Sequence, residues 1–342
     1  MKFRTVITAV ALLALAAAAC KKEESTKSYL SGTLKVDTDM PVYVQPGSKY
    51  GFTPSGITAP DGTDVAYYFQ SPITNYKDTV RSETHPETTF MYEVPDTIGT
   101  FSMSCVAYPV QSSDKYYVSS TSTEFVIVKE GFGKGLTITG YRRYLEDEVR
   151  TLWGREYYLM KSGSTEWIRW NLCHIVNDDE GEPVFGRPYY DSPAMQNIFG
   201  AFYTWTEAQE ACPPGWHLPS DAEWVELLKE NGAPADLEPL QDSPSGAGKL
   251  MVNASFNEGR MWEYYRDVKI SDASHFSAMP VGYALIRNDG YNFTGYGSYA
   301  VFWTSDEHEG KGVYRYLYKE KDWVYSGFAD KDTFAASVRC VR

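Results

Sequence analysis

The chain has 342 residues, of which 43% are hydrophobic, so it is long enough to build more than one packed core. Its 45 acidic residues outnumber 32 basic residues, which gives a formal net charge of −13 and a surface that repels polyanions. We therefore expect two domains and no nucleic-acid partner. With 27 tyrosines and 9 tryptophans, the composition is also unusually aromatic.

The N-terminal segment has the pattern of a secretory signal. Basic residues precede an apolar run, Val6–Ala19, which ends at Cys20. The run is shorter than the roughly 20 residues needed to span a bilayer, and its basic, apolar, small-residue order is typical of an exported protein. We predict a signal peptide over residues 1–19 and a flexible polar tether over residues 20–28.

Two short motifs here resemble lipoprotein signals. Ala17-Ala18-Ala19-Cys20 resembles a bacterial lipobox, which implies that Cys20 becomes a lipidated N-terminus. Lys22-Glu23-Glu24 resembles the export signal of Bacteroidetes lipoproteins, which implies an anchor in the outer membrane and exposure at the cell surface. The alternatives are an ordinary signal peptide and an ordinary solvated linker.

Residues 29–130 are expected to form an all-β sandwich. Five segments are rich in Val, Tyr, Phe and Thr and alternate in polarity between turn clusters. The stretch from Asp96 to Cys105 resembles the late strands of immunoglobulin-like or PKD-like modules, which implies a spacer domain. Cys105 has no partner in this half and is expected to be a buried thiol. The five segments are Tyr29–Val36, Val65–Gln70, Thr89–Val94, Gly99–Tyr108 and Glu124–Val128.

Two threonines in this region lie in a short motif. Asp78-Thr79-Val80 and Asp96-Thr97-Ile98 resemble the acceptor motif for O-glycosylation in Bacteroidetes. Thr79 and Thr97 are therefore candidate modification sites. The alternative is that both are plain surface threonines.

Glycines near residue 131 mark the end of the first domain. We expect a linker over residues 131–156, in which Leu136–Tyr144 forms a connecting strand. The second domain is then expected to cover residues 157–342.

Two helices are predicted in the second domain. Thr204 with Glu207, and Ser220 with Glu223, have the spacing of a capping box, in which a hydroxyl and a carboxylate satisfy backbone donors at a helix start. Proline and glycine residues end each helix. Between the helices, Gly215–Pro219 alternates in polarity as a short strand does.

These helices lie within a recognisable pattern. Several segments resemble, in order, the Fibrobacter succinogenes major paralogous domain, a C-type-lectin-like module of surface proteins of Bacteroidetes and Fibrobacteres. The resemblance implies an α+β C-type-lectin-like fold for the C-terminal domain. The segments are Trp167–Leu172, Cys212–Trp224, Phe276–Tyr283, Ala300–Ser305 and Ser337–Arg342.

The same resemblance pairs Cys212, on the first helix, with Cys340, in the final strand, as a disulfide. Cys173 has no expected mate. The fold is shared with formylglycine-generating enzymes, whose oxidase activity needs two thiolates that bind copper. A disulfide would consume Cys212 and Cys340, so we expect neither this activity nor a cofactor.

No other catalytic or metal-binding pattern is evident. The chain lacks a G-x-S-x-G elbow and a P-loop. His217 is expected to be a structural histidine bonded to nearby backbone. The acidic pair Asp178-Asp179 is expected to be solvated, and Asp306, Glu307 and Glu309 are the only clustered candidates for calcium. We predict that the protein is not an enzyme and holds no metal.

The aromatic residues near the C-terminus give the best candidate for binding. One group lies among glycines and asparagines in residues 290–299, where a loop tolerates exposed rings. A second group alternates in polarity around the charged turn Lys319–Asp322 and predicts a hairpin, with half of its rings in the core and half available to a ligand. The candidate ligand-binding residues are Tyr291, Tyr296, Tyr299, Trp323 and Tyr325.

Together these patterns favour a lipid-anchored surface protein whose lectin-like head binds a glycan or a protein non-covalently, as in adhesion. The first alternative is a structural or assembly component of a surface appendage or glycan-capture complex. A third alternative is an enzyme related to formylglycine-generating oxidases.

Overall fold

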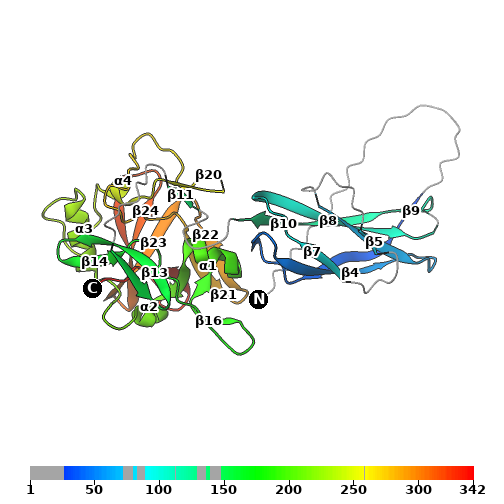
Figure 1. Cartoon of the computed structure of the whole chain (residues 1–342), viewed down its shortest axis with the longest axis horizontal. Helices are drawn as coiled ribbons and strands as arrows, with labels where there is room; N and C mark the ends of the chain where they lie inside the picture. The colour runs from blue at the N-terminus through cyan, green and yellow to red at the C-terminus, as the bar shows by residue number, and fades with distance from the viewer. Residues whose placement is uncertain are drawn as a thin grey trace. The chain divides into compact units, whose positions relative to one another are not determined.

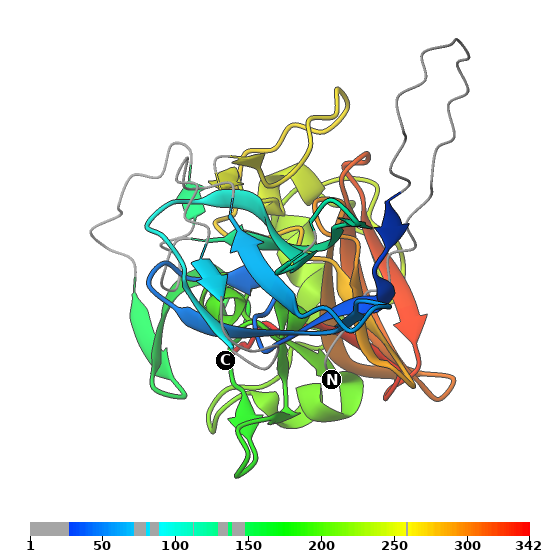
Figure 2. The same ribbon diagram turned by 90° about the vertical axis from the view of Figure 1, so that its right-hand side faces the viewer.

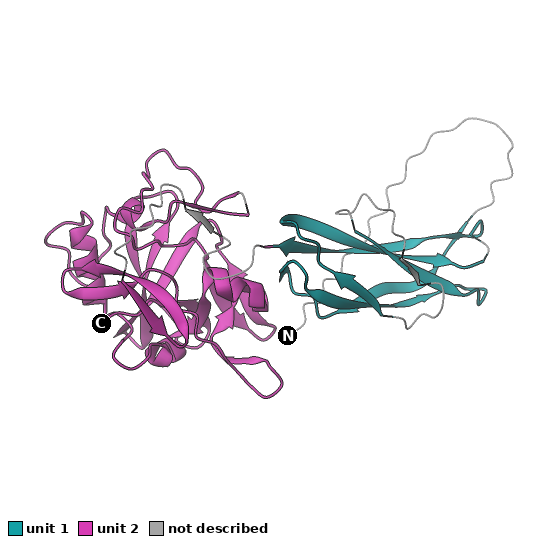
Figure 3. Cartoon of the chain, viewed as in Figure 1, with its two compact units in different colours: residues 1–127 teal, residues 128–342 magenta. Residues whose placement is uncertain are grey.

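The computed structural model describes residues 27–71, 80–82, 89–111, 113–128, 136–138, 148–257 and 259–342. The chain divides into two compact units, Met1–Ile127 and Val128–Arg342, which are coloured separately in Figure 3. The predicted signal peptide, the lipidation site Cys20 and the candidate Thr79 lie outside the described residues. Thr97 is described, and it lies half-buried in the turn before a strand.

The first unit contains a mixed sheet, an antiparallel sheet and a short parallel strand pair (Figure 1). The larger sheet has the order β3-β10-β8-β5-β6, and the smaller sheet has the order β2-β4-β7. The strands are β1 (Ser28–Tyr29), β2 (Ser31–Thr38), β3 (Tyr43–Val44), β4 (Lys49–Thr58), β5 (Val65–Gln70), β6 (Val80–Ser82), β7 (Phe90–Glu93), β8 (Gly99–Pro109), β9 (Tyr116–Tyr117) and β10 (Ser119–Ile127).

The two sheets share one hydrophobic core. Phe52 and Tyr92 come from the smaller sheet, and Phe69 and Phe125 come from the larger one. The rings of Phe52 and Phe69 lie 5.7 Å apart, and those of Tyr92 and Phe125 lie 5.9 Å apart. Cys105 lies in the same core, and burial raises the pKa of its thiol to about 12. The prediction that this cysteine is a buried thiol is therefore confirmed.

Strand β4 was not predicted, because it contains residues that rarely occur inside strands. Pro54 and Gly56 both lie within it. The register between β2 and β4 shifts between Gly32 and Lys35. A Cβ on Gly32 would lie 2.1 Å from the carbonyl oxygen of Gly56, so the two backbones approach each other where no side chain fits. This local bulge explains how the pairing accommodates the glycines.

The second unit is organised around a sheet of eight strands. Its order is β17-β18-β26-β23-β24-β25, and β21 also pairs with β26 and with β22. Figure 2 shows neighbouring strands of this sheet in orange and red. The strands are β17 (Arg187–Pro188), β18 (Ala201–Thr204), β21 (Tyr283–Arg287), β22 (Gly290–Thr294), β23 (Tyr299–His308), β24 (Lys311–Tyr318), β25 (Val324–Ala329) and β26 (Phe334–Ser337).

Short helices and small sheets surround this sheet. The helices are η1 (Tyr189–Asp191), α1 (Pro193–Phe199), α2 (Trp205–Ala211), α3 (Asp221–Glu230) and α4 (Ala247–Leu250). The remaining strands are β11 (Leu136–Ile138), β12 (Val149–Leu152), β13 (Arg155–Ser162), β14 (Thr165–Ile168), β15 (Val176–Asn177), β16 (Pro183–Phe185), β19 (Ala254–Phe256) and β20 (Gly259–Arg260).

Both predicted helices are confirmed with their capping boxes. Thr204 caps α2 and Ser220 caps α3, each with a glutamate at the third helical position. The strand predicted over Gly215–Pro219 is wrong, since only His217 makes a single bridge, to Val341. A strand is not sustained because Gly215 has a positive φ of 84° and Pro219 has no backbone N–H to donate.

Helix α3 covers one face of the large sheet. The indole of Trp224 packs 5.2 Å from Phe276 and 5.5 Å from Phe302, which lies on β23. On the opposite face, Trp205 of α2 covers one end of the sheet. Its Nε1 donates to the carbonyl oxygen of Thr304 at 3.0 Å, and its ring occupies the space where Gly312 has no side chain. Farther along the same face, β24 carries the half-buried tyrosines of the candidate site.

Candidate binding surface

An aromatic ladder runs across β23, β24 and β25 on this second face. Tyr299 lies opposite Tyr318, and Tyr316 lies opposite Tyr325. Residues directly opposite each other in antiparallel strands point to the same side of the sheet. The ladder consists of Tyr299, Tyr314, Tyr316, Tyr318, Trp323 and Tyr325.

Four rings of the ladder stand upright on the sheet, those of Tyr299, Tyr316, Tyr318 and Tyr325. The centroids of Tyr299 and Tyr318 are 4.8 Å apart with ring planes 25° apart, and those of Tyr316 and Tyr325 are 4.8 Å apart at 16°. This distance matches the spacing of neighbouring strands, so nearly parallel rings cannot lie flat on the sheet. Their edges and hydroxyl groups therefore point away from the sheet.

The ladder remains open because the alternate residues form the core. Val313, Arg315 and Leu317 of β24 are fully buried, whereas the intervening tyrosines are half-buried. Trp323 ends the row, with 39% of its surface exposed, and its indole stacks 5.8 Å from Tyr325. Partial burial thus fixes the rings in place and leaves one side of each for a ligand.

A glycine makes room for one ring of the ladder. Gly327 lies opposite Tyr314, and a Cβ added there would lie 2.4 Å from Cζ of that ring. Tyr314 therefore lies across the strand β25. Its ring also packs 5.8 Å from the buried Trp303 and stacks 5.2 Å from Phe334, which in turn stacks 5.0 Å from Tyr283. Phe334 and Trp303 are buried, so the open part of the aromatic face ends at Tyr314.

The structure divides the predicted ligand-binding residues into two places. Tyr299, Trp323 and Tyr325 belong to the ladder. Tyr291 lies beneath the guanidinium of Arg187, at 5.3 Å, and burial raises the pKa of its hydroxyl to about 12. Tyr296 stacks 5.7 Å from the buried Phe199. Neither Tyr291 nor Tyr296 joins the ladder.

The hairpin predicted around Lys319–Asp322 is confirmed by the pairing of β24 with β25. Tyr314, Tyr316 and Tyr318 were not predicted as site residues. Their alternation was a usable signal, but it did not reveal which side of the hairpin the rest of the fold would cover.

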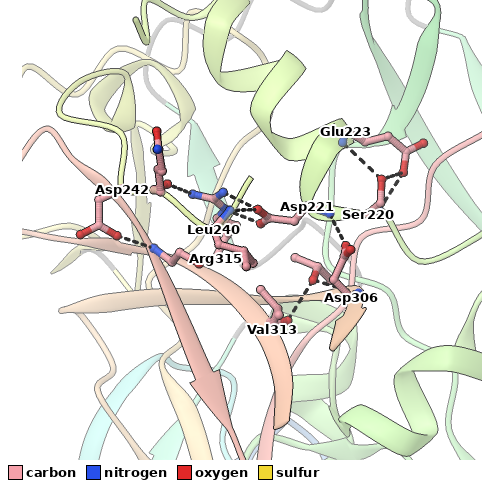
Figure 4. A network of polar contacts seen from close by, with 11 residues as sticks. Ser220, Asp221, Glu223, Leu240, Asp242, Asp306, Val313 and Arg315 are labelled. Atoms are coloured by element: carbon pink, nitrogen blue, oxygen red, sulfur yellow. Dashed lines mark hydrogen bonds and ion pairs between the residues drawn. The ribbon is translucent and has the colours of Figure 1, made fainter. Parts of the chain in front are cut away.

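A buried polar network lies on the other side of the same strands (Figure 4). Arg315 Nε donates to Asp221 Oδ1 at 2.5 Å, and its Nη2 donates to Asp221 Oδ2 at 2.6 Å. Asp221 Oδ2 also accepts the backbone N–H of Leu240, and Arg315 Nη1 donates to the carbonyl oxygen of Gln241, both at 2.6 Å. The ion pair therefore fixes the loop around residues 240–242 against β24.

Three of the predicted acidic residues are engaged in structural contacts, whereas Glu309 is exposed. Asp306 Oδ2 accepts the backbone N–H of Asp221 at 2.6 Å, and Glu307 pairs with Lys331. Asp178 Oδ1 accepts the N–H groups of Glu180 and Glu182 and so caps the turn between β15 and β16. Within the described residues, no three His, Cys, Asp or Glu side chains are grouped to hold a metal ion.

The prediction that the ring of His217 bonds to nearby backbone is wrong. Its Nε2 lies 3.0 Å from Oε1 of Glu223, the glutamate of the α3 capping box. The ring is exposed enough to reach this carboxylate across the start of the helix. A contact of this kind depends on how the chain folds back, which local sequence does not encode.

The predicted disulfide between Cys212 and Cys340 is confirmed. It joins the C-terminal end of α2 to the segment that follows β26, so Cys340 lies just beyond the final strand rather than within it. Cys105 and Cys173 are both buried free thiols, and no bridge joins them. Burial raises the pKa of Cys173 as well, which disfavours its reactive thiolate.

None of the helices formed by the described residues combines the length and the apolar character that a membrane crossing requires.

The second unit is therefore a strand-rich module with a fixed disulfide and an open aromatic face. The family model of the Fibrobacter succinogenes major domain matches residues 160–342, and the chain belongs to this family. A search of the curated proteins found no match.

Proposed function

We propose that the chain is a cell-surface binding protein whose head, residues 157–342, has a C-type-lectin-like fold and holds a glycan or protein ligand non-covalently. The observation that carries this proposal is the aromatic ladder. Upright tyrosines combine apolar ring edges with hydroxyl groups at little cost in side-chain entropy, which suits them to recognition.

The sequence supports the rest of this proposal. The lipobox at Ala17–Cys20 supports a lipid anchor at Cys20 in the outer membrane, and Lys22-Glu23-Glu24 supports display at the cell surface. The two-sheet first unit then serves as an immunoglobulin-like or PKD-like spacer, with Thr97 as a candidate glycosylation site. Because Cys212 and Cys340 form a disulfide, the proposal assigns them a structural rather than a redox role.

A binding experiment tests the proposal. Residues 21–342 are applied to a glycan array and are also used to capture proteins from a cell-surface extract. We expect a ligand whose binding falls at least about tenfold when Trp323 and Tyr325 are both replaced by alanine, since truncating central aromatic anchors costs 1 kcal/mol or more each. Tyr264→Ala is the matched control, because Tyr264 is 73% exposed and lies outside the ladder.

Circular dichroism establishes that the double variant is folded. If the folded double variant keeps full affinity, the aromatic ladder is not the binding surface. Capture of protein partners that the double variant retains in full, without any glycan, would favour the alternative role as a component of a surface assembly.

A further inference from the structure

A carboxylate is held in a fixed position beside the aromatic ladder. Asp242 Oδ1 accepts the backbone N–H of Ser326, on β25, at 2.8 Å (Figure 4). The residues on either side of Asp242 are anchored too. Gln241 accepts from the buried Arg315, and Ser243 exchanges two backbone hydrogen bonds with Val324, at 2.8 and 3.0 Å. The carboxylate is therefore preorganised by a buried ion pair and an extra strand contact.

Burial and the negative charge of Asp242 both raise the pKa of two tyrosines in the middle of the ladder. Burial raises the pKa of Tyr316 to about 12, and the charge of Asp242 contributes to the rise. Burial and then Asp242 also raise the pKa of Tyr325. The hydroxyl groups are thus protonated at neutral pH, and the field around them is negative. Within the described residues, no cation pairs with Asp242, which is itself exposed.

A second carboxylate lies near the turn at the end of the ladder. Glu320 Oε1 accepts the hydroxyl of Tyr265 at 2.7 Å, and a hydrogen bond to Glu320 raises the pKa of Tyr318. The nearby Lys319 is already paired with Glu263, although Lys321 in the same turn is exposed. Besides the hydrogen bond from Tyr265, the charges of Lys319 and Lys321 help to lower the pKa of Glu320. Asp242 is therefore the carboxylate next to the ladder that has no lysine or arginine partner in the described part of the chain.

We propose that the partner of the aromatic ladder is a cationic protein segment, with arginine or lysine side chains that lie against Trp323 and reach Asp242. This inference rests on the proposed function, because it names the partner of the same surface. Trp323 is the terminal ring, and Tyr325 is the only ring that packs against it among the described residues. An indole face is the best aromatic partner for a cation, and arginine is enriched together with tyrosine at protein interfaces.

The upright rings favour a protein over a sugar. A pyranose ring stacks on the face of an aromatic ring, whereas Tyr299, Tyr316, Tyr318 and Tyr325 cover one another's faces. What they offer is a row of edges and hydroxyl groups beside a fixed negative charge. Backbone carbonyls and arginine side chains of a protein segment match such a row.

The test uses a fluorescently labelled hexa-arginine peptide, with hexa-glutamate as the negative probe, and residues 21–342. Fluorescence anisotropy gives the affinity at about 20 mM and about 150 mM NaCl, since screening weakens exposed charge pairs. We expect binding of hexa-arginine alone and a loss of about threefold with Asp242→Asn, which keeps an acceptor for Ser326, in line with a partly exposed ion pair. Trp323→Ala is expected to weaken binding further.

The matched control is Asp289→Asn, which removes the same charge from an exposed turn between β21 and β22. Equal losses in the two acid variants would mean general attraction to the net charge and would overturn the inference. Absence of hexa-arginine binding would also overturn it. A neutral glycan that still requires Trp323 and Tyr325 would do the same while leaving the proposed function intact.

Discussion

The buried pair of Arg315 and Asp221 shows how one side chain determines the position of several others. Both side chains are almost fully removed from solvent, and each also satisfies a backbone group of the loop at residues 240–241. Burying two charges is costly, and the bidentate geometry with its extra hydrogen bonds offsets that cost. The pair therefore fixes a loop more than it adds stability.

Removing one partner is expected to be severe. Asp221→Asn leaves an uncompensated buried guanidinium and should lower the free energy of unfolding of the second unit by about 3–5 kcal/mol. Urea denaturation followed by tryptophan fluorescence measures this change. The control is Asp267→Asn, which breaks an exposed pair with Arg266 and should leave the urea midpoint unchanged. Similar midpoints for both variants would contradict a structural role of the buried pair.

At the scale of single elements, helix α3 links stability to pH through its capping box. Burial would raise the pKa of Glu223, but hydrogen bonds from Ser220 and His217 outweigh it, and the net pKa lies below the ordinary value of 4.5. A depressed carboxyl pKa contributes stability above the unfolded pKa, and this contribution is lost as the pH falls through the lower folded pKa.

Glu223→Gln removes the negative charge at the start of α3 and keeps the size of the side chain. Glutamine also fits a capping box, so the variant should fold but be less stable than the natural chain at pH 7. The difference should vanish well below pH 4.5, where Glu223 is protonated in the folded and the unfolded chain. Urea midpoints across this pH range measure it. The control is Glu226→Gln on the same helix. Its difference in urea midpoint from the natural chain should not show the same dependence on pH.

For the strands β23, β24 and β25, local sequence predicts the hairpin but not which face of the sheet is covered. The hairpin follows from alternation and a charged turn, which are local signals. Which face is covered depends on α3 and α2, which pack from distant parts of the chain. For the same reason Arg315 was missed, since a buried charge breaks the polarity pattern that identifies core positions.

The glycine beneath Tyr314 offers a direct test of the ladder geometry. Gly327→Ala places a Cβ 2.4 Å from Cζ of Tyr314 and should displace that ring, with a loss of about 1–3 kcal/mol in stability from overpacking. In a Tyr314→Ala background, the same substitution should cost almost nothing. Thermal unfolding of the four chains in this double-mutant cycle measures the coupling. Additive losses would show that the ring does not lie over Gly327.

At the scale of the whole molecule, the disulfide spans 128 positions and confines its effect to the second unit, because both cysteines belong to it. The resemblance predicted this pairing from the order of matching segments. The sequence alone left every other cysteine pairing open, because spacing does not determine connectivity.

Cys212→Ser combined with Cys340→Ser should lower the stability of the second unit by up to about 4–5 kcal/mol in the chain-entropy model. The first unit should unfold at an unchanged temperature. Differential scanning calorimetry resolves the two transitions. Added reductant should lower the second transition of the natural chain and leave the double variant unaffected. A shift of the first transition would show that the units are coupled.

Strand β26 has one further consequence. It lies between β18 and β23, and the residues after it bind much earlier segments: Leu172 donates to Val338, and Val341 donates to His217. The second unit therefore cannot close its sheet while residues 334–341 are still inside the ribosome. Until these residues are released, β18 and β23 lack the strand that lies between them, and the backbone groups of Leu172 and His217 lack their partners.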